Sequence, residues 1–340
     1  MKRLPVAEAI GQTLCHDMTA IRPDGFKGAA FRRGHVIRAE DVPVLLRMGK
    51  AHVFVWNPSA DEVHEVDAGL AGAKALCGDG ITYTGPIEGR YSLIAEQDGL
   101  FTVNRTALRA FNAVPDYTAA TLPGYTPVRA GDRVAGVRIV PLVTARKNVA
   151  QVETLGVAQG LVLSVHPYRA LQVGVVITGS EVYNGLIEDR FEPVLRAKVA
   201  PFGGRVLGVT KCPDDLAAIE SAARAFLAEG AALIFFTGGM SVDPDDLTPA
   251  AIRATGAEVV TQGVPVQPGN MLMLAYLGDT ALVGVPGAAM HHQTTALDVI
   301  LPRIFVGDKL TAEDFADLGE GGLCRRCETC AYPTCYFGRC

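Results

Sequence analysis

A glycine turn followed by an acidic loop is the stretch of this sequence whose residue types and spacing could do chemistry. The apolar run 231–236 has the character of a strand buried on both faces, and it ends at the turn 237–239, Thr-Gly-Gly. Backbone N–H groups in such a turn can bind phosphate, and glycines there leave the backbone open to a ligand. The acidic loop 243–246 would repel a phosphate unless a hard cation such as Mg²⁺ lay between them. The stretch therefore predicts a phosphorylated ligand with a metal; a tight turn and a helix cap are the structural alternative.

Three further loops follow apolar strand patterns and contain glycines or carboxylates: 178–181, 212–215 and 286–288. In open α/β sheets ligands bind outside the carboxyl ends of the strands, so we expect all four loops at one edge. The candidates for catalysis are Asp214, Asp215 and Asp246, the last also as a metal ligand. The candidates for binding the ligand are Thr178, Gly179, Glu181, Thr237, Gly238, Gly239, Ser241, Pro286 and Gly287. We expect His291 and His292 to open the last helix as structural residues.

The elements that must position these residues alternate between strand and helix patterns. Strands are predicted at 171–178, 205–210, 231–236, 257–261, 271–276 and 281–285, and helices at 191–202, 216–229, from 248, and 288–300. This alternation predicts a doubly wound, three-layer α/β/α domain over residues 165–308.

Two smaller units are predicted upstream, an α+β unit over 1–60 and a mostly β unit over 61–160. In the first we expect a short helix at 5–10, a strand at 14–20, a turn at 22–25, a loop at 27–34, a helix at 39–48 and a strand at 51–56. In the second we expect a helix at 106–114 and a small antiparallel sheet or barrel over 127–143.

Composition narrows the class of protein. Apolar residues make up 49% of the 340 residues and charged residues 20%, enough for a sizeable core in two or three domains. A net charge of −5 argues against a nucleic-acid partner, which requires clustered Lys and Arg. No apolar run approaches the ~20 residues that span a bilayer, and the N-terminus lacks the apolar core of a signal peptide. We therefore expect a cytoplasmic protein.

Five of the eight cysteines lie in a tail over 320–340, with the spacing C-x2-C-x2-C-x4-C-x4-C. They are Cys324, Cys327, Cys330, Cys335 and Cys340. The first three spacings bring thiolates within reach of one centre, as in iron–sulfur or zinc sites, and any four of the five could ligate. Free thiols or disulfides are the alternative. Arg325, Arg326 and Arg339 would offset the charge of thiolates.

At this point the α/β pattern resembles the molybdopterin-binding domain shared by molybdenum cofactor biosynthesis proteins of the MoeA and MogA type. The segments that carry the resemblance are TGSEVYNGLIEDRFEPVL (178–195), KCPDDLAAI (211–219), FFTGGMSVDPDDLTPAAI (235–252) and VGVPGAA (283–289). In the first unit, PVAEAIGQTLCHD and FRRGHVIRAEDVPVLLRMGKAHVFV are similar to the MoeA type. The DDLT segment also resembles the related domain of CinA-type proteins, which act on nucleotides.

The resemblance implies a site for the pterin dithiolene ligand, with its phosphate on Thr237, Gly238, Gly239 and Ser241. Asp214 or Asp215, together with Asp246, would match the acidic positions tied to Mg²⁺ and adenylated pterin, and Glu181 the acid of the first turn.

Three functions are compatible with this resemblance. The first is cofactor maturation, as a molybdopterin molybdenumtransferase that inserts molybdenum. The second is a non-catalytic carrier or sensor of finished molybdenum cofactor, which docks on a molybdoenzyme. The third is a CinA-like nucleotide hydrolase. Related proteins are dimers or trimers, so a homo-oligomer is expected.

Overall fold

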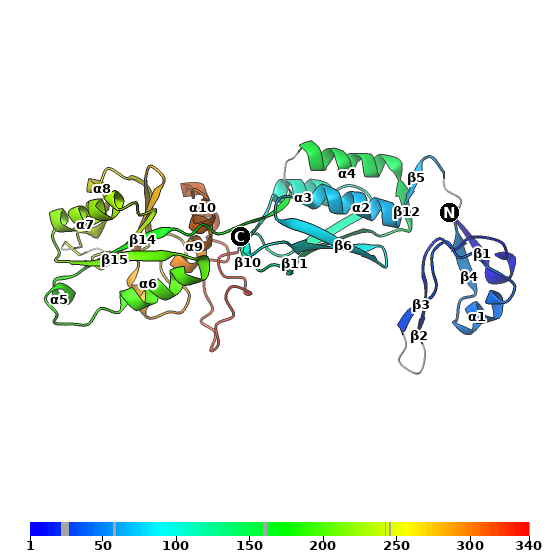
Figure 1. Cartoon of the computed structure of the whole chain (residues 1–340), viewed down its shortest axis with the longest axis horizontal. Coiled ribbons are helices and arrows are strands. Elements are labelled where there is room, and N and C mark those ends of the chain that lie inside the picture. The colour runs from blue at the N-terminus through cyan, green and yellow to red at the C-terminus, as the bar shows by residue number, and fades with distance from the viewer. Residues whose placement is uncertain (22–26, 57–58, 159–161, 242, 245, 340) are drawn as a thin grey trace. The chain divides into compact units, whose positions relative to one another are not determined.

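The computed structural model describes residues 1–21, 27–56, 59–158, 162–241, 243–244 and 246–339 (Figure 1). The chain divides into two compact units. Unit 1 consists of 1–96, 103–122 and 130–164, and unit 2 of 97–102, 123–129 and 165–340. Within the described residues, none of the helices is long and apolar enough to cross a membrane.

Unit 2 contains the predicted α/β domain, built on a six-stranded sheet in the order β15-β14-β16-β19-β18-β17. Its strands are β14 (Gln172–Thr178), β15 (Arg205–Cys212), β16 (Leu233–Thr237), β17 (Glu258–Gln262), β18 (Met273–Leu277) and β19 (Thr280–Val285). Its helices are α5 (Ser180–Tyr183), α6 (Phe191–Val199), η2 (Ala200–Phe202), α7 (Leu216–Ala228), α8 (Thr248–Ala254), η3 (Gly287–Met290), α9 (Ala296–Val306) and α10 (Ala312–Asp317). The first four strands in the order are parallel, whereas β18 runs antiparallel to both β19 and β17.

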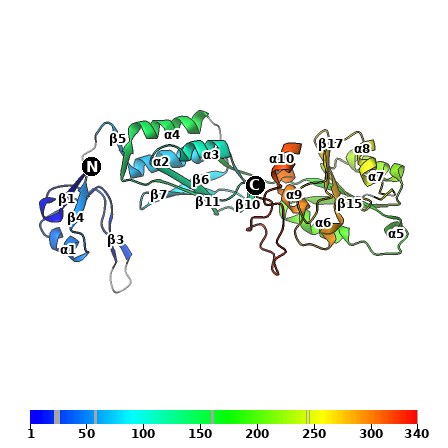
Figure 2. The ribbon, with the colours of Figure 1, turned by 180° about the vertical axis from the view of Figure 1, so that it is seen from behind.

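Helices cover both faces of this sheet, as Figure 2 shows from behind. Successive strand residues point to opposite faces. Thus Ile177 and Phe235 pack in the core with α6 and α9, whereas Val176 and Phe236 pack with α7 and α8. Because both faces are buried, the strands read as continuous apolar runs. The predicted α/β/α architecture is confirmed.

The last helix was predicted at the wrong place. Residues 287–290 form the short helix η3, and α9 begins only at Ala296. Thr295 caps α9 in a capping box with Asp298, and this local signal places the start of the helix after the polar segment 291–294. His291 and His292 therefore lie between the two helices and do not open one.

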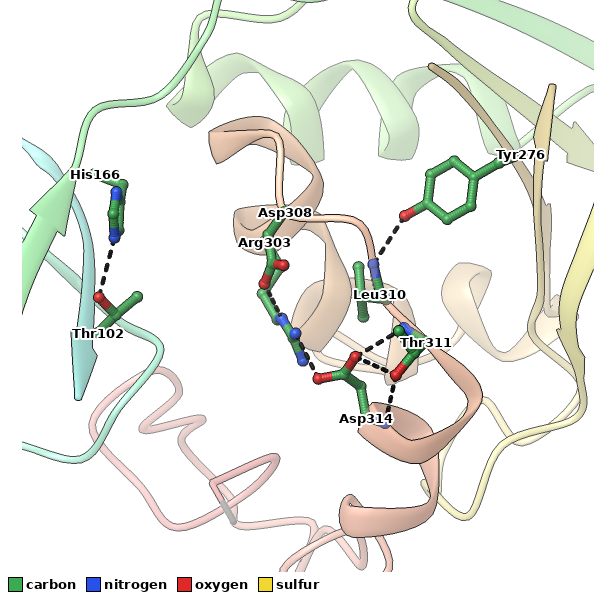
Figure 3. Close-up of polar contacts among 8 residues, drawn as sticks. All are labelled: Thr102, His166, Tyr276, Arg303, Asp308, Leu310, Thr311 and Asp314. Carbon is green, nitrogen blue, oxygen red and sulfur yellow. Dashed lines mark hydrogen bonds and ion pairs between the residues drawn. The ribbon is translucent and has the colours of Figure 1, made fainter. Parts of the chain in front are cut away.

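A charged cluster fastens the end of α9 to α10 (Figure 3). The guanidinium of Arg303, whose side chain is 8% exposed, pairs with Asp308 and Asp314 at 2.7 Å each. The Tyr276 hydroxyl accepts the N–H of Leu310 (3.2 Å), which ties this region to β18.

Unit 1 begins with two antiparallel strand pairs, β1–β4 and β2–β3, and a small core around Leu14 and Leu45. Its first elements are β1 (Lys2–Pro5), η1 (Val6–Glu8), β2 (Met18–Ile21), β3 (Lys27–Phe31), α1 (Asp41–Arg47) and β4 (His52–Val55). The predicted loop 27–34 was wrong over 27–31, because pairing with β2 makes this glycine-containing segment a strand. The predicted turn 22–25 lies outside the described residues.

The rest of unit 1 has an antiparallel sheet in the order β6-β7-β11-β9, a two-stranded pair β12-β5, and three helices. The elements are β5 (Glu62–His64), α2 (Glu65–Leu76), β6 (Ile81–Ile87), β7 (Arg90–Ala95), α3 (Arg105–Asn112), β9 (Tyr117–Thr121), β11 (Arg133–Ile139), β12 (Val143–Ala145) and α4 (Arg146–Ala158). A three-stranded sheet, β10-β8-β13, is formed by β8 (Gly99–Val103), β10 (Thr126–Val128) and β13 (Leu163–His166), and most of its residues belong to unit 2.

The sequence did not predict α2 and α4. Glycine disfavours helix, and α2 contains Gly69 and Gly72. The structure explains both glycines of α2. A Cβ on Gly69 would lie 3.1 Å from the Tyr91 ring, and a Cβ on Gly72 would lie 3.0 Å from the Tyr117 ring. Close packing on the sheet therefore makes this segment helical, although its local helix propensity is low.

Candidate functional site

The four predicted loops leave one edge of the sheet, because the strands before them are parallel and end in register. Thr178 is level with Cys212, and Thr237 is level with both Ile177 and Val285. The carboxyl ends of β14, β15, β16 and β19 thus lie next to one another, as the sequence predicts.

The glycine turn after β16 is packed tightly against its neighbours. Gly238 has a left-handed φ of +81°, and a Cβ on it would lie 2.2 Å from the carbonyl oxygen of Thr178. Gly239 has φ +53°, and a Cβ there would lie 2.9 Å from Thr248 Oγ1. The sequence predicts that these glycines leave the backbone open to a ligand. In the structure the space that each missing Cβ leaves is filled by the protein's own threonines.

A buried threonine network holds this turn in place. Thr178 Oγ1 donates to the carbonyl oxygen of Thr237 (3.0 Å), and Thr248 Oγ1 donates to that of Gly238 (2.8 Å). The two hydroxyl oxygens lie 3.1 Å apart. Thr248 opens α8 and was not among the predicted site residues, although its position directly after the acidic loop is a signal in the sequence.

Thr237 carries a hydroxyl that is fully buried and, within the described part of the chain, has no hydrogen-bond partner. A buried polar atom without a partner costs free energy. This cost falls on the first residue of the turn that the sequence predicts to hold phosphate.

Asp214 links two of the loops. Its Oδ2 accepts the N–H of Ser180 (2.9 Å) and the hydroxyl of Ser180 (3.0 Å), which ties the loop after β15 to the loop after β14. Ser180 is a site residue that sequence reasoning missed, since a single serine in a turn carries no special signal.

Asp215 and Asp246 have different surroundings. Asp215 is exposed and caps α7, because its Oδ1 accepts the N–H of Ala218 (2.8 Å). Asp246 is half-buried, and its Oδ2 accepts the N–H of Asp243 (3.1 Å) inside the acidic loop. Among the described residues, the hydrogen bonds of the three candidate carboxylates therefore go to separate partners. Asp245 of the same loop lies outside the described residues.

The remaining candidates lie along the same edge. Glu181, Ser241 and Gly287 are exposed, Gly179 is half-buried before α5, and Pro286 is buried after β19. Among these remaining candidates, Glu181 thus supplies an exposed carboxylate and Ser241 an exposed hydroxyl.

The predicted metal sites are not supported. No group of three or more His, Cys, Asp or Glu side chains among the described residues is arranged to hold a metal ion. The described tail cysteines are free thiols, and Cys340 lies outside the described residues. The described tail cysteines therefore do not form a set of four thiolates around one centre.

Comparison with known families identifies the class of the α/β domain. Residues 174–305 match the family described as "Probable molybdopterin binding domain", so the predicted resemblance is confirmed for this part of the chain. Residues 3–57 match a family described as a domain of unknown function. The resemblance of the first unit to the MoeA type stays a prediction.

Among individual proteins, a CinA-like protein of Mycobacterium sp. (strain MCS) is 37% identical over 90 residues, which cover 26% of this chain and 21% of the relative. The molybdopterin molybdenumtransferase of Synechococcus elongatus is 29% identical over 147 residues, covering 40% of this chain and 36% of the relative. The chain thus spans well under half of either relative.

Two solved structures are similar to part of the chain. One is the molybdopterin biosynthesis enzyme MoaB of Thermus, with 20% identity, a TM-score of 0.33, and coverage of 41% of this chain and 98% of that chain. The other is CinA of Thermoplasma acidophilum, with 17% identity, a TM-score of 0.36, and coverage of 40% and 98%.

Proposed function

We propose that the carboxyl edge of the sheet binds molybdopterin or its adenylate, and that the protein takes part in molybdenum cofactor biosynthesis. The observation that carries the proposal is the meeting of four loops at one edge, within the segment that matches the molybdopterin-binding family. A ligand outside the carboxyl ends of parallel strands is the general arrangement in such sheets.

The residues of this chain supply binding and orientation. The turn at Gly238 and Gly239 would receive the phosphate through backbone N–H groups. Asp214 would position the loop after β14 through Ser180. The half-buried Asp246 would face the phosphate or pyrophosphate from the neighbouring loop.

The described residues contain no preformed set of three or more side chains that could coordinate Mg²⁺. Mg²⁺ is often held by one or two carboxylates together with phosphate oxygens of a substrate. The effect of Mg²⁺ on ligand binding is therefore measured directly in the experiment below.

The finer proposal is molybdenum insertion, in which loading of molybdate onto the dithiolene of an adenylated pterin releases AMP. This finer proposal includes a molybdoenzyme as the partner and a homo-oligomeric state of the chain. Binding without turnover supports the carrier instead. Cleavage of a pyridine nucleotide or ADP-ribose supports a nucleotide hydrolase, a reading that the CinA-like segment favours.

The test measures binding of adenylated molybdopterin to the whole chain by calorimetry, with and without Mg²⁺, and AMP release after molybdate is added. We expect Asp214→Asn and Asp246→Ala each to weaken binding at least about tenfold, a loss of roughly 1.4 kcal/mol. Asp246→Ala should also abolish AMP release. The affinity of Asp215→Asn, measured in the same way, then shows whether the carboxylate of Asp215 also contributes to binding.

Asp189→Asn is the matched control. Asp189 accepts the N–H of Phe191 with Oδ1 and the N–H of Glu192 with Oδ2, at the start of α6. Asparagine can keep one of these two bonds while removing the same charge. Equal affinity in the wild type, Asp214→Asn and Asp246→Ala would refute this site. No measurable affinity of the wild type would refute the function.

A further inference from the structure

The cysteine tail forms a loop closed at its base. The N–H of Gly338 donates to the carbonyl oxygen of Gly321 (3.1 Å), and the hydroxyl of Tyr336 donates to that of Leu323 (2.6 Å). Phe337 is 1% exposed and belongs to the core of the α/β domain. The residues between these anchors therefore have a defined arrangement, although they form no helix or strand.

A cavity of about 200 Å³ lies inside this loop, and every tail cysteine that the structure describes lines it. These are Cys324, Cys327, Cys330 and Cys335. Segment 291–294, which precedes α9, also lines the cavity, as do Arg325, Arg326 and Glu328. The thiols thus share one small space with two positive charges and one negative charge, so the arginines leave a net positive charge.

The sulfur atoms differ in their surroundings. Cys327 is exposed, so a molecule in solution can reach it. Cys324 is half-buried, and its Sγ accepts the N–H of Arg326 (3.4 Å). Arg326 has a left-handed φ of +54°, so the chain turns between the two cysteines. The Sγ of Cys330 instead lies 3.2 Å from Thr294 Oγ1, against the domain.

We propose that Cys324 and Cys327 form a redox-active dithiol that reacts with acidic low-molecular-weight disulfides, of which glutathione disulfide is the test compound. The carboxylates of such a molecule would be attracted by Arg325 and Arg326. None of the residues that line this cavity belongs to the glycine turn, and the inference does not depend on the proposed function.

The reaction balances as thiol–disulfide exchange. The deprotonated sulfur of Cys327 attacks one sulfur of the small disulfide, forming a mixed disulfide and releasing one small thiolate. The deprotonated sulfur of Cys324 then attacks Cys327 Sγ, closes the internal S–S bond and releases the second thiolate. The two cysteines lose two electrons to the small molecule, and their two protons end on the two released thiols.

Three cysteines outside the tail serve as internal controls. Burial raises the pKa of Cys15 and of Cys77 to about 11, and it also raises the pKa of Cys212. Because the thiolate is the nucleophile, these residues should react slowly.

The experiment incubates the whole chain with glutathione disulfide at neutral pH, alkylates the remaining thiols and maps them by mass spectrometry. We expect two tail thiols to be lost, with an internal disulfide between Cys324 and Cys327. Their loss should be at least about tenfold faster than that of Cys15, Cys77 or Cys212. The variant Cys327→Ser should lose the internal disulfide, whereas Cys212→Ser should form it at the wild-type rate.

The wild-type map alone can overturn the proposal, so the test does not depend on the folding of a variant. Equal oxidation of tail and buried cysteines would contradict it, as would a disulfide that joins Cys340 instead. A native mass that includes a metal ion, with tail thiols that resist alkylation until a chelator is added, would replace the dithiol by a metal site.

Discussion

At the residue scale, the glycine turn shows that two separate structural requirements make residue 238 a glycine. Gly238 needs a left-handed backbone, and it needs the absence of a Cβ because Thr178 fills that space. Spacing alone predicts that a turn lies here and that ligands approach it. It cannot show that the neighbouring strand end already occupies one side of the glycine, because that contact depends on the pairing of β14 with β16.

The variant Gly238→Ala should be destabilised by roughly 3 kcal/mol or more, because left-handed strain and a collision with Thr178 act together. Chemical denaturation would measure this change. Gly230→Ala is the matched control, since Gly230 has φ +84° but a Cβ added to it would meet none of the described atoms within 4 Å. It should cost only about 1–2 kcal/mol. Equal losses would show that the collision is absent.

Asp314 gives a prediction for the pH dependence of stability. Partial burial opposes its ionisation, but hydrogen bonds from Arg303 and Thr311 outweigh this effect and lower the pKa of the carboxyl group (Figure 3). The ionised group therefore contributes stability above the ordinary pKa of about 4, and this is lost as the pH falls through the lower, folded-state pKa.

The variant Asp314→Asn should accordingly be less stable than the wild type at pH 7, and the difference should shrink below about pH 4. Thermal unfolding over a pH series would measure it. Asp317→Asn removes the same charge from an exposed position on α10 and should leave the pH profile unchanged. A constant difference between Asp314→Asn and the wild type at every pH would contradict the assignment.

At the scale of elements, helix boundaries follow local caps where a cap is present. Asp215 begins α7, and the capping box of Thr295 and Asp298 begins α9. The first was predicted from the sequence. The second was missed, because the helix-forming residues 288–290 suggested an earlier start. The helix α2 was missed for the opposite reason, since its glycines are explained only by the sheet beneath them.

The cap on α7 gives a prediction that tests whether Asp215 has a structural role, independently of ligand binding. Asp215→Ala should lower the free energy of unfolding by about 1 kcal/mol, because the N–H of Ala218 loses its acceptor. Asp215→Asn should restore most of it. If Asp215→Ala were as stable as the wild type, capping would not be the role of this carboxylate.

At the scale of the whole molecule, the chain is two compact units with separate cores. The proposed ligand site belongs to unit 2 alone. A ligand that binds only the folded form stabilises the unit to which it binds.

Calorimetry of the whole chain should therefore show two unfolding transitions. Molybdopterin at about a hundredfold excess over its Kd should stabilise one of them by about 2.7 kcal/mol and leave the other unchanged. Asp189→Asn should show the same shift, and Asp246→Ala should lose it. A shift of both transitions would mean that the units unfold together or that both bind the ligand.

The sequence by itself determined the α/β/α class of the domain, the strands that end at the site and the candidate residues in their loops. It could do so because strands buried on both faces read as apolar runs and because glycines and carboxylates mark their ends. Only the tertiary structure decided that Asp214 binds Ser180, that the threonines surround the turn and that the tail cysteines share a cavity. These contacts join residues far apart in the chain, and their distances depend on sheet order and packing, which spacing along a sequence does not encode.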